Sequence, residues 1–281
     1  MLDQAETVEG TTVLVVDNDP AASAMALAAE FPPGRVTVVH EPTPGIVAGR
    51  NRALDETADA DVLVFIDDDE QPEDGWLRSM LDTWHRTGAA AVSGPVLSTF
   101  AEAPDPWITG GEFFVRRRLP TGTDLTIAAT GNLLLDVAQV RQAGVRFDRR
   151  FAMSGGSDSL FTRQLHGQGA RMVWCDEARV CDVVPAARAN RRWVLQRAVR
   201  SGNVASRVEI VLARGLVHRG ATRAVCAGQG LVRIVGGSVR VAFGTVTRSL
   251  THQAQGARTV ARGAGMVTGA FGHTREEYRR R

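Results

Sequence analysis

Short apolar runs that end in polar turn residues recur along the first hundred positions. Four of these runs predict buried strands, at residues 12–17, 35–40, 61–66 and 89–96. Helices are predicted between them, at residues 21–31, 46–58 and 73–87. Because strands and helices alternate and the strands are apolar throughout, the pattern predicts an α/β fold with a mainly parallel sheet and helices on both faces.

The pattern changes twice further along the chain. Residues 100–150 are less regular and rich in glycine, and we expect loops and a short sheet there. A helix at 158–169 and a strand from 171 follow. From about residue 190 the pattern predicts long helices with many glycines. No window of about 18–20 apolar residues is free of charge, so a simple transmembrane helix is not expected.

Charge divides the chain into two parts. All thirty-three basic residues are arginine, and the absence of lysine excludes a Walker A phosphate loop and Schiff-base chemistry. From residue 191 onward, seventeen arginines face three carboxylates. An acidic body and a basic tail suggest two functions, and we predict one domain at 1–203 and a basic helical C-terminal extension at 204–281.

The cysteines and the first ten residues indicate the cellular compartment in which the protein works. Cys175, Cys181 and Cys226 form no CxxC pair and no zinc spacing, which indicates thiols in a reducing compartment. The first ten residues have neither the basic nor the apolar region of a signal peptide. We therefore expect a cytoplasmic protein.

Carboxylates follow two of the predicted strands. Asp17 ends the first, and Asp67, Asp68 and Asp69 follow the third. In a parallel sheet, ligands bind at these carboxyl ends. Three adjacent carboxylates repel one another, and Mg²⁺ or Mn²⁺ with a diphosphate would relieve that repulsion, since both cations prefer carboxylate and phosphate oxygens. A solvated acidic turn is the alternative.

An ordered set of motifs extends this picture. VVDND at 15–19, GRNRAL at 49–54, DDDE at 67–70, TGNLLLD at 130–136, and GGSDSLFTRQLHGQGARMVW at 155–174 follow one another along the chain. Together they resemble the family 2 glycosyltransferases, which have the GT-A nucleotide-binding fold, over roughly residues 11–203. The resemblance implies a metal-dependent hexosyltransferase, with a nucleotide-diphosphate sugar as donor and a saccharide or lipid-linked hydroxyl as acceptor.

The resemblance also implies roles for single residues on the donor side. Asp69 matches the metal ligand of the family's Asp-x-Asp motif, while Asp67 and Asp68 would face ribose or metal. The residues expected beside the nucleotide are Asp17, Asn18, Arg50 and Asn51. Arg50 is also expected there without the resemblance, because a guanidinium group complements a diphosphate. A surface arginine is the alternative.

Further roles concern the acceptor side. Asp158 matches the catalytic base, which is usually the second residue of a Glu-Asp pair; here the pair is Ser157-Asp158, and both residues also suit a helix N-cap. Asp182 falls where many such enzymes place a third metal ligand, although a surface aspartate fits as well. The acceptor or diphosphate side would comprise Gly131, Asn132, Arg192 and Trp193.

Two alternatives compete with an active transferase. The family begins with a strand and loop that hold the nucleobase, and only about ten residues precede Thr11 here, so we expect that first strand to be missing. A truncated, non-catalytic binding protein is one alternative. A receiver-type signalling domain is the other, suggested by VLVVDNDP and VLVFIDDDE, but it requires a lysine that the chain lacks.

The basic extension admits two interpretations. A basic helix with an apolar face can lie in the interface of an anionic membrane, which suits a lipid-linked acceptor and a peripheral position at the inner face of the cell membrane. A helical cap on the catalytic domain is the alternative. Nucleic acid is disfavoured as a partner because the extension is poor in aromatic residues.

Overall fold

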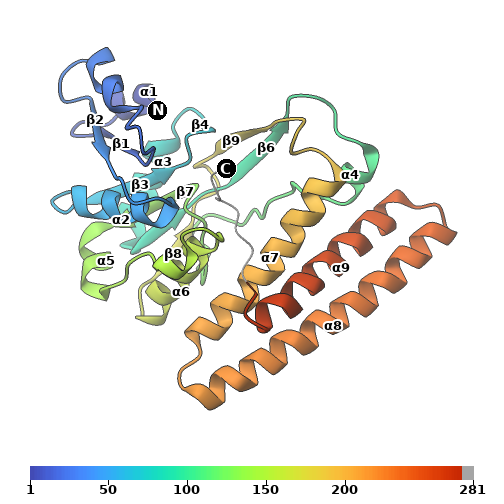
Figure 1. The fold of residues 1–281 in the computed structure, drawn as a ribbon. Coiled ribbons are helices and arrows are strands. Elements are labelled where there is room, and N and C mark those ends of the chain that lie inside the picture. Colours follow the sequence, from blue (N-terminus) through green and yellow to red (C-terminus); the bar gives the residue numbers. More distant parts are fainter. Residues whose placement is uncertain (274–281) are drawn as a thin grey trace. The chain divides into compact units, whose positions relative to one another are not determined.

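The computed structural model describes residues 1–273 of the chain (Figure 1). Residues 274–281 of the predicted extension lie outside the described part. Two compact units are present, each built from several stretches of chain. The first unit comprises Met1–Leu97, Arg116–Met153 and Ser157–Asp182. The second comprises Ser98–Val115, Ser154–Gly156 and, among the described residues, 183–273.

The first half of the chain alternates strands and helices. In order, its elements are α1 (Leu2–Glu6), β1 (Val13–Asp17), the 3₁₀ helix η1 (Met25–Glu30), β2 (Val36–His40), α2 (Ile46–Glu56), β3 (Val62–Ile66), β4 (Glu70–Pro72), α3 (Trp76–Thr87), β5 (Ala91–Ser93), β6 (Val96–Phe100) and α4 (Pro106–Gly110). The remaining elements are β7 (Asn132–Asp136), α5 (Val137–Ala143), the 3₁₀ helix η2 (Arg149–Phe151), α6 (Ser157–Gly167), β8 (Met172–Trp174), β9 (Val180–Val184), α7 (Arg191–Leu212), α8 (Leu216–Val246) and α9 (Leu250–Ala270).

The largest sheet has the strand order β3-β7-β5-β8. β5 and β8 are parallel, whereas β7 is antiparallel to both of its neighbours, β3 and β5. A separate parallel pair, β1-β2, and a sheet of order β4-β9-β6 complete the topology. The α/β class is confirmed, but the sheet is only partly parallel, because β7 runs against the strands on either side of it.

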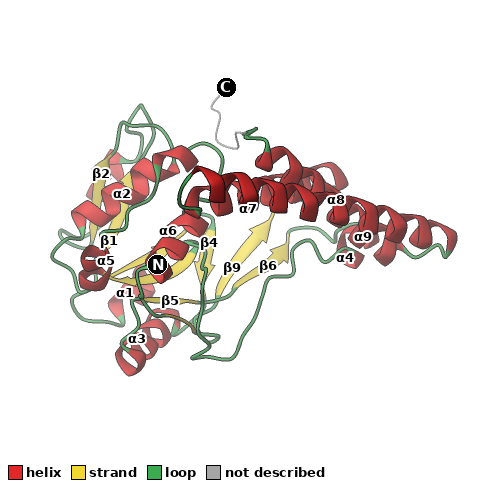
Figure 2. Ribbon diagram, turned by 90° about the horizontal axis from the view of Figure 1, so that it is seen from below, coloured by secondary structure: helices red, strands yellow, loops and turns green. Residues whose placement is uncertain are grey.

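Side chains that point alternately to the two sides of β7 explain why helices cover both faces of this sheet. Leu133 and Leu135 point into one core with Phe161 of α6, while Leu134 between them packs with Trp76 of α3. Successive side chains of a strand face opposite sides. All three leucines are fully buried, and Figure 2 shows α3 on one side of the strands, with α2 and α6 on the other.

One predicted α-helix is absent from the observed structure. Residues 21–31 contain instead the short 3₁₀ helix η1, and none of its residues is buried. The carboxylate of Asp17 accepts hydrogen bonds from the backbone N–H groups of Asp19 and Ala24, at 2.9 and 2.7 Å. These bonds hold the preceding residues in turns and prevent a regular helix from starting there.

Close backbone contacts hold together the three long helices of the second unit (Figure 1). α8 carries Gly230, Gly237 and Gly244 at intervals of seven residues. The first two face Gly263 and Gly256 of α9, and Gly244 faces His252 and Gln253. A Cβ on Gly237 would lie 2.8 Å from the carbonyl oxygen of Gly256, and the reverse substitution would give the same distance. Only hydrogen fits between these backbones, which explains the many glycines of this segment.

The glycine contacts predict opposite effects for two adjacent substitutions. Gly237→Ala should lower the free energy of unfolding by about 1–3 kcal/mol, because the new methyl group forces α8 away from α9. Gly236→Ala is the matched control: a Cβ there meets nothing within 4 Å, and alanine should raise helix stability by about 0.5–1 kcal/mol. Urea unfolding followed by circular dichroism measures both, and equal effects would contradict the close approach.

Candidate functional site

The acidic run lies directly after β3. Ile66, the last residue of β3, pairs with Asn132 of β7, so the next residue, Asp67, emerges at the sheet edge. The backbone N–H of Asp67 donates to Oε2 of Glu70 at 3.4 Å, and the carbonyl of Asp67 accepts from the N–H of Glu70 at 3.1 Å. This turn leaves the Asp67, Asp68 and Asp69 side chains exposed, while Glu70 is buried.

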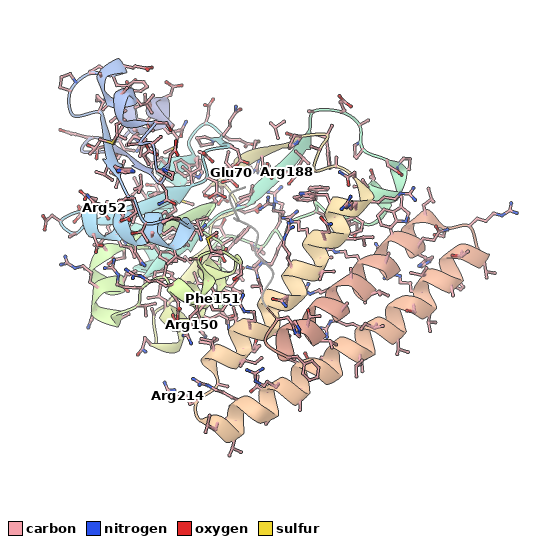
Figure 3. The ribbon with its side chains drawn as sticks, viewed as in Figure 1. Arg52, Glu70, Arg150, Phe151, Arg188 and Arg214 are labelled. Carbon is pink, nitrogen blue, oxygen red and sulfur yellow. The ribbon has the colours of Figure 1, made fainter. Side chains whose placement is uncertain are left out.

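Glu70 lies opposite one of the predicted metal ligands, Asp182, on the neighbouring strand. It begins β4 and lies directly opposite Asp182 of β9 in antiparallel register, and Figure 3 labels it on this segment. Like charges directly opposite each other destabilise a strand pair. Arg116 offsets the repulsion, because its Nη2 forms an ion pair with Oδ2 of Asp182 at 2.9 Å.

Burial and mutual repulsion raise the pKa of two of these carboxyl groups. Burial, and then the charge of Asp67, raise the pKa of Glu70 to about 8, against the opposing effects of the Asp67 N–H and Arg116. The pKa of Asp67 is raised mainly because protein atoms crowd and desolvate it, although its side chain still reaches solvent; Arg50 acts in the opposite direction. The site thus holds more negative charge than it can stabilise unaided.

The candidate base belongs to the same charged group. Asp158 is near enough to Asp67 for its charge to contribute to the raised pKa of that carboxyl. It lies in the first turn of α6, where its Oδ1 accepts from the N–H of Ser159 at 2.7 Å. Within residues 1–273, its Oδ2 makes no hydrogen bond, which leaves this oxygen able to accept a proton from a substrate.

Arg50 connects the acidic run to α6. Its Nη1 donates to the hydroxyl of Ser157 at 2.9 Å, and its guanidinium lies over the ring of Phe147, 5.6 Å from the centroid. In the family pattern an acidic residue usually precedes the base. The serine found here keeps a hydrogen bond to the arginine without adding another negative charge.

Gly131 and Asn132, adjacent in sequence, have different surroundings. A Cβ on Gly131 would lie 3.0–3.1 Å from carboxylate oxygens of Glu70 and Asp67, so Gly131 borders the acidic group. The side chain of Asn132 is buried. Its Oδ1 accepts from the indole of Trp76 at 2.9 Å, and its Nδ2 donates to the carbonyls of Pro95 and Ala178 at 3.0 and 2.7 Å.

The other predicted nucleotide-side residues stabilise turns. Asn18 donates to the carbonyls of Glu41 and Thr43, at 2.8 and 2.6 Å, and accepts from the N–H of Gly45. The amide of Asn51 exchanges two hydrogen bonds with the backbone of Phe147, at 2.9 and 3.0 Å. The Asn18 bonds hold the turn after β1 against the residues that precede α2, and the Asn51 bonds hold the middle of α2 against Phe147. A direct contact with a nucleotide stays a prediction.

Arg192 and Trp193 belong to the second unit, at the start of α7. The ring of Trp193 stacks on Phe114, with 5.9 Å between centroids and an interplanar angle of 5°. The guanidinium of Arg197 lies 5.5 Å from the centroid of the same tryptophan ring. Arg192 is exposed on the helix surface, and its predicted role remains a prediction.

The donor set suits a hard cation that brings ligands of its own. In the described part of the chain, no three His, Cys, Asp or Glu side chains form a group that could hold a metal ion. The available donors are carboxylate oxygens beside Gly131, where the missing side chain leaves room. Mg²⁺ is usually held by one or two carboxylates, with phosphate and water completing its shell, and these residues fit that arrangement.

Comparison with known proteins identifies the family. The sequence model described as glycosyl transferase family 2 matches residues 1–140. The chain is 34% identical over 207 residues to the succinoglycan biosynthesis protein ExoM of Rhizobium meliloti (strain 1021), covering 73% of this chain and 67% of that protein. The chain belongs to glycosyl transferase family 2. It is a glycosyltransferase that depends on a nucleotide sugar.

Solved structures show the same fold for this glycosyltransferase. GalNAc-T7 in complex with UDP, GalNAc and Mn²⁺ matches with a TM-score of 0.52 and 13% identity, over 72% of this chain and 42% of that one. Residues 1–349 of S. aureus TarS match with a TM-score of 0.50 and 11% identity, over 92% of this chain and 85% of that one. The predicted GT-A fold is thereby confirmed.

Two residues of the candidate site were not predicted from the sequence. Glu70 ends the DDDE run, but only its burial and its partner Asp182 distinguish it from the exposed carboxylates beside it. Arg116 opens a run of three arginines, and the run itself was the available signal. Its members have separate partners: Arg117 lies over the ring of Trp174, and Arg118 forms an ion pair with Asp176.

The raised pKa of Glu70 predicts a pH-dependent stability. A folded-state pKa of about 8, above the ordinary value of 4.5, means that the folded protein holds this proton more tightly than the unfolded chain. This contribution to stability is fully present below pH 4.5 and is lost as the pH rises through about 8. In metal-free buffer, Glu70→Gln should therefore raise the melting temperature by a few degrees at pH 9, with no gain below pH 4.5. Differential scanning calorimetry at several pH values tests this, and a pH-independent difference would contradict it.

Proposed function

We propose that this glycosyltransferase moves a sugar from a nucleoside-diphosphate donor to an acceptor hydroxyl in a single displacement that inverts the anomeric carbon. The observation that carries the proposal is the hydrogen bond from Arg50 to Ser157, the neighbour of Asp158, at 2.9 Å, together with the charges of Arg50 and Asp158 that both act on the Asp67 carboxyl. It supports one site in which a base for the acceptor and a carboxylate for the donor act on the same bond.

In the reaction, the carboxylate of Asp158 accepts the proton of the acceptor hydroxyl. The hydroxyl oxygen forms a bond to the anomeric carbon from the face opposite the diphosphate. The bond between that carbon and the diphosphate oxygen breaks, and its electron pair leaves with the nucleoside diphosphate. Arg50, whose charge partly offsets the raised pKa of Asp67, adds positive charge on the donor side.

We assign the metal ligands of the donor site to Asp69 and Asp67, with Asp182 as a further candidate. A divalent cation bound there, Mg²⁺ or Mn²⁺, would stabilise the negative charge that develops on the leaving diphosphate. The Mn²⁺ complex of GalNAc-T7 and the hard oxygen donors around Gly131 support this assignment. Asp17, Asn18 and Asn51 would position the loops that hold the nucleoside.

The acceptor is proposed to be a growing saccharide of a polysaccharide pathway. ExoM is named for succinoglycan biosynthesis, which supports this class of acceptor. A lipid-linked saccharide would bring the enzyme to an anionic membrane surface, and the arginine-rich helices of the second unit suit such a surface. No helix in the described part of the chain is long and apolar enough to cross a membrane.

Replacement of the proposed base tests the mechanism. Asp158→Asn should lower kcat by about 10²–10⁴ and leave donor affinity unchanged, because the amide cannot accept the proton but its oxygen can still accept the hydrogen bond from the N–H of Ser159. Asp55→Asn is the matched control, since Asp55 is an exposed carboxylate paired with Arg146. Rates would be measured as nucleoside diphosphate release. A near-normal rate for Asp158→Asn would show that this residue is only a helix cap.

Replacement of the proposed metal ligand separates donor binding from folding. Asp69→Ala should abolish the Mn²⁺-dependent part of donor binding, measured by titration calorimetry with UDP-sugars and with EDTA as the metal-free reference. Far-ultraviolet circular dichroism should be unchanged, since the Asp69 side chain is exposed. Asp74→Ala, an exposed carboxylate further along the chain, is the control. Undiminished Mn²⁺-dependent binding by Asp69→Ala would reject the assignment.

A further inference from the structure

The long helices α8 and α9 carry arginines but no acidic residue. Four of these arginines gather at one place, an open pocket of about 460 Å³ in the second unit. The pocket is lined by Arg233, Arg240, Arg258 and Arg262, together with Glu112, Gln255 and Thr259. Four guanidinium groups against a single carboxylate make this a strongly positive cavity.

Three of the pocket arginines are hydrogen-bonded, but only to neutral groups. Arg240 donates to Gln255, Arg258 donates to the backbone carbonyls of Gly111 and Glu112 at 3.2 and 3.0 Å, and Arg233 donates to the carbonyl of Gln229 within its own helix. Within residues 1–273, none of the four forms an ion pair. Their fixed partners are neutral groups, so the positive charge remains available to an anion.

The arginines also repel one another. The pKa of Arg262 lies below its usual range because neighbouring protein atoms desolvate it and because Arg233 and Arg258 add to the positive charge around it. An anion with several oxygens would relieve this repulsion, and guanidinium groups match phosphate oxygens in both charge and geometry.

A row of exposed apolar side chains adjoins the pocket on α8. Its members are 55–83% exposed and recur at helical spacing on one face of the helix: Val225, Val232, Val235, Val239, Phe243 and Val246. Val232 and Val239 directly precede the pocket residues Arg233 and Arg240, so the two features share neighbouring faces of one helix. Contiguous exposed apolar surface of this kind marks an interaction site.

We propose that the apolar face of α8 lies in the surface of an anionic membrane, with the arginine pocket holding the phosphate of a lipid headgroup. The valines and Phe243 would enter the boundary between headgroups and acyl chains, while the arginines meet the phosphates. This inference deepens the membrane association proposed above. It does not depend on the transferase reaction.

Charge favours a membrane over other occupants of this face. A second copy of the chain would present the same helix, with arginines and no carboxylate to pair with them. Nucleic acid would neutralise the arginines but would leave the valine row without an apolar partner. An anionic bilayer supplies both the opposite charge and an apolar layer beneath it.

Vesicle flotation and anion titration of the full chain test the proposal. The protein should float with phosphatidylcholine vesicles that contain phosphatidylglycerol, and not with phosphatidylcholine alone. Arg262→Gln should lower vesicle affinity about tenfold or more, through loss of charge-assisted hydrogen bonds to phosphate. Arg219→Gln removes the same charge from α8 outside the pocket and should cost at most about fivefold, the general effect of one surface charge.

A second pair of measurements separates the pocket from the apolar face. Pyrophosphate, titrated by calorimetry, should bind the wild type and Arg219→Gln but not Arg262→Gln. The double variant Val235→Ser/Val239→Ser should keep pyrophosphate binding and lose vesicle binding. All of these side chains reach solvent, so circular dichroism should be unchanged, and none of these readouts requires turnover.

Three results would overturn the proposal. Equal losses of vesicle affinity for Arg262→Gln and Arg219→Gln would mean that only general charge attracts the membrane. Pyrophosphate binding without vesicle binding would assign the pocket to a soluble anion. Self-association that is lost in Val235→Ser/Val239→Ser, without vesicle binding, would assign the apolar face to a second copy of the chain.

Discussion

The side-chain amide of Asn132 is the contact on which the arrangement of the first unit depends most. Its three hydrogen bonds connect β7 to α3, to the segment after β5 and to the segment before β9. Its backbone pairs with Ile66, the residue before Asp67, and Ala178 stands shortly before the strand that carries Asp182. One buried amide therefore fixes the distance between the two stretches of chain that supply the carboxylates, and a buried amide left partly unpaired would be costly.

The carboxylates near Asn132 carry more negative charge than the neighbouring arginines neutralise. Arg50 and Arg116 each offset part of it, and Glu70 accommodates the rest by holding its proton. The arginine pocket shows the opposite imbalance, since four cations line it beside one carboxylate and form no ion pair within residues 1–273. Both imbalances are typical of sites whose counterion arrives with a ligand, a cation with a diphosphate in one case and a headgroup phosphate in the other.

The sequence predicted those parts of the structure that depend on local pattern. Strands at residues 12–17, 35–40 and 61–66 follow from apolar runs closed by turn residues, and the aspartates at the carboxyl ends of the first and third can be read from the same pattern. The antiparallel direction of β7 does not, because a run such as Leu133–Leu135 is equally apolar in either orientation. The 3₁₀ helix at Met25–Glu30 depends on the Asp17 carboxylate, and the roles of Glu70 and Arg116 depend on strand register with Asp182. The contacts with Asp182 join residues distant in sequence, which no local window contains. The Asp17 bonds are local, but apolar periodicity does not show which backbone groups a carboxylate will bind.

The glycine contacts between α8 and α9 have a consequence for how this segment can evolve. The facing glycines recur every seven residues, so a single-residue insertion or deletion between Gly230 and Gly244 would rotate the following part of the helix by about 100°. It would then turn bulky side chains towards the partner backbone and displace the arginines and valines from their respective faces. Related sequences should therefore vary freely in the side chains exposed along α8, yet preserve the length of both helices between their glycines without gaps.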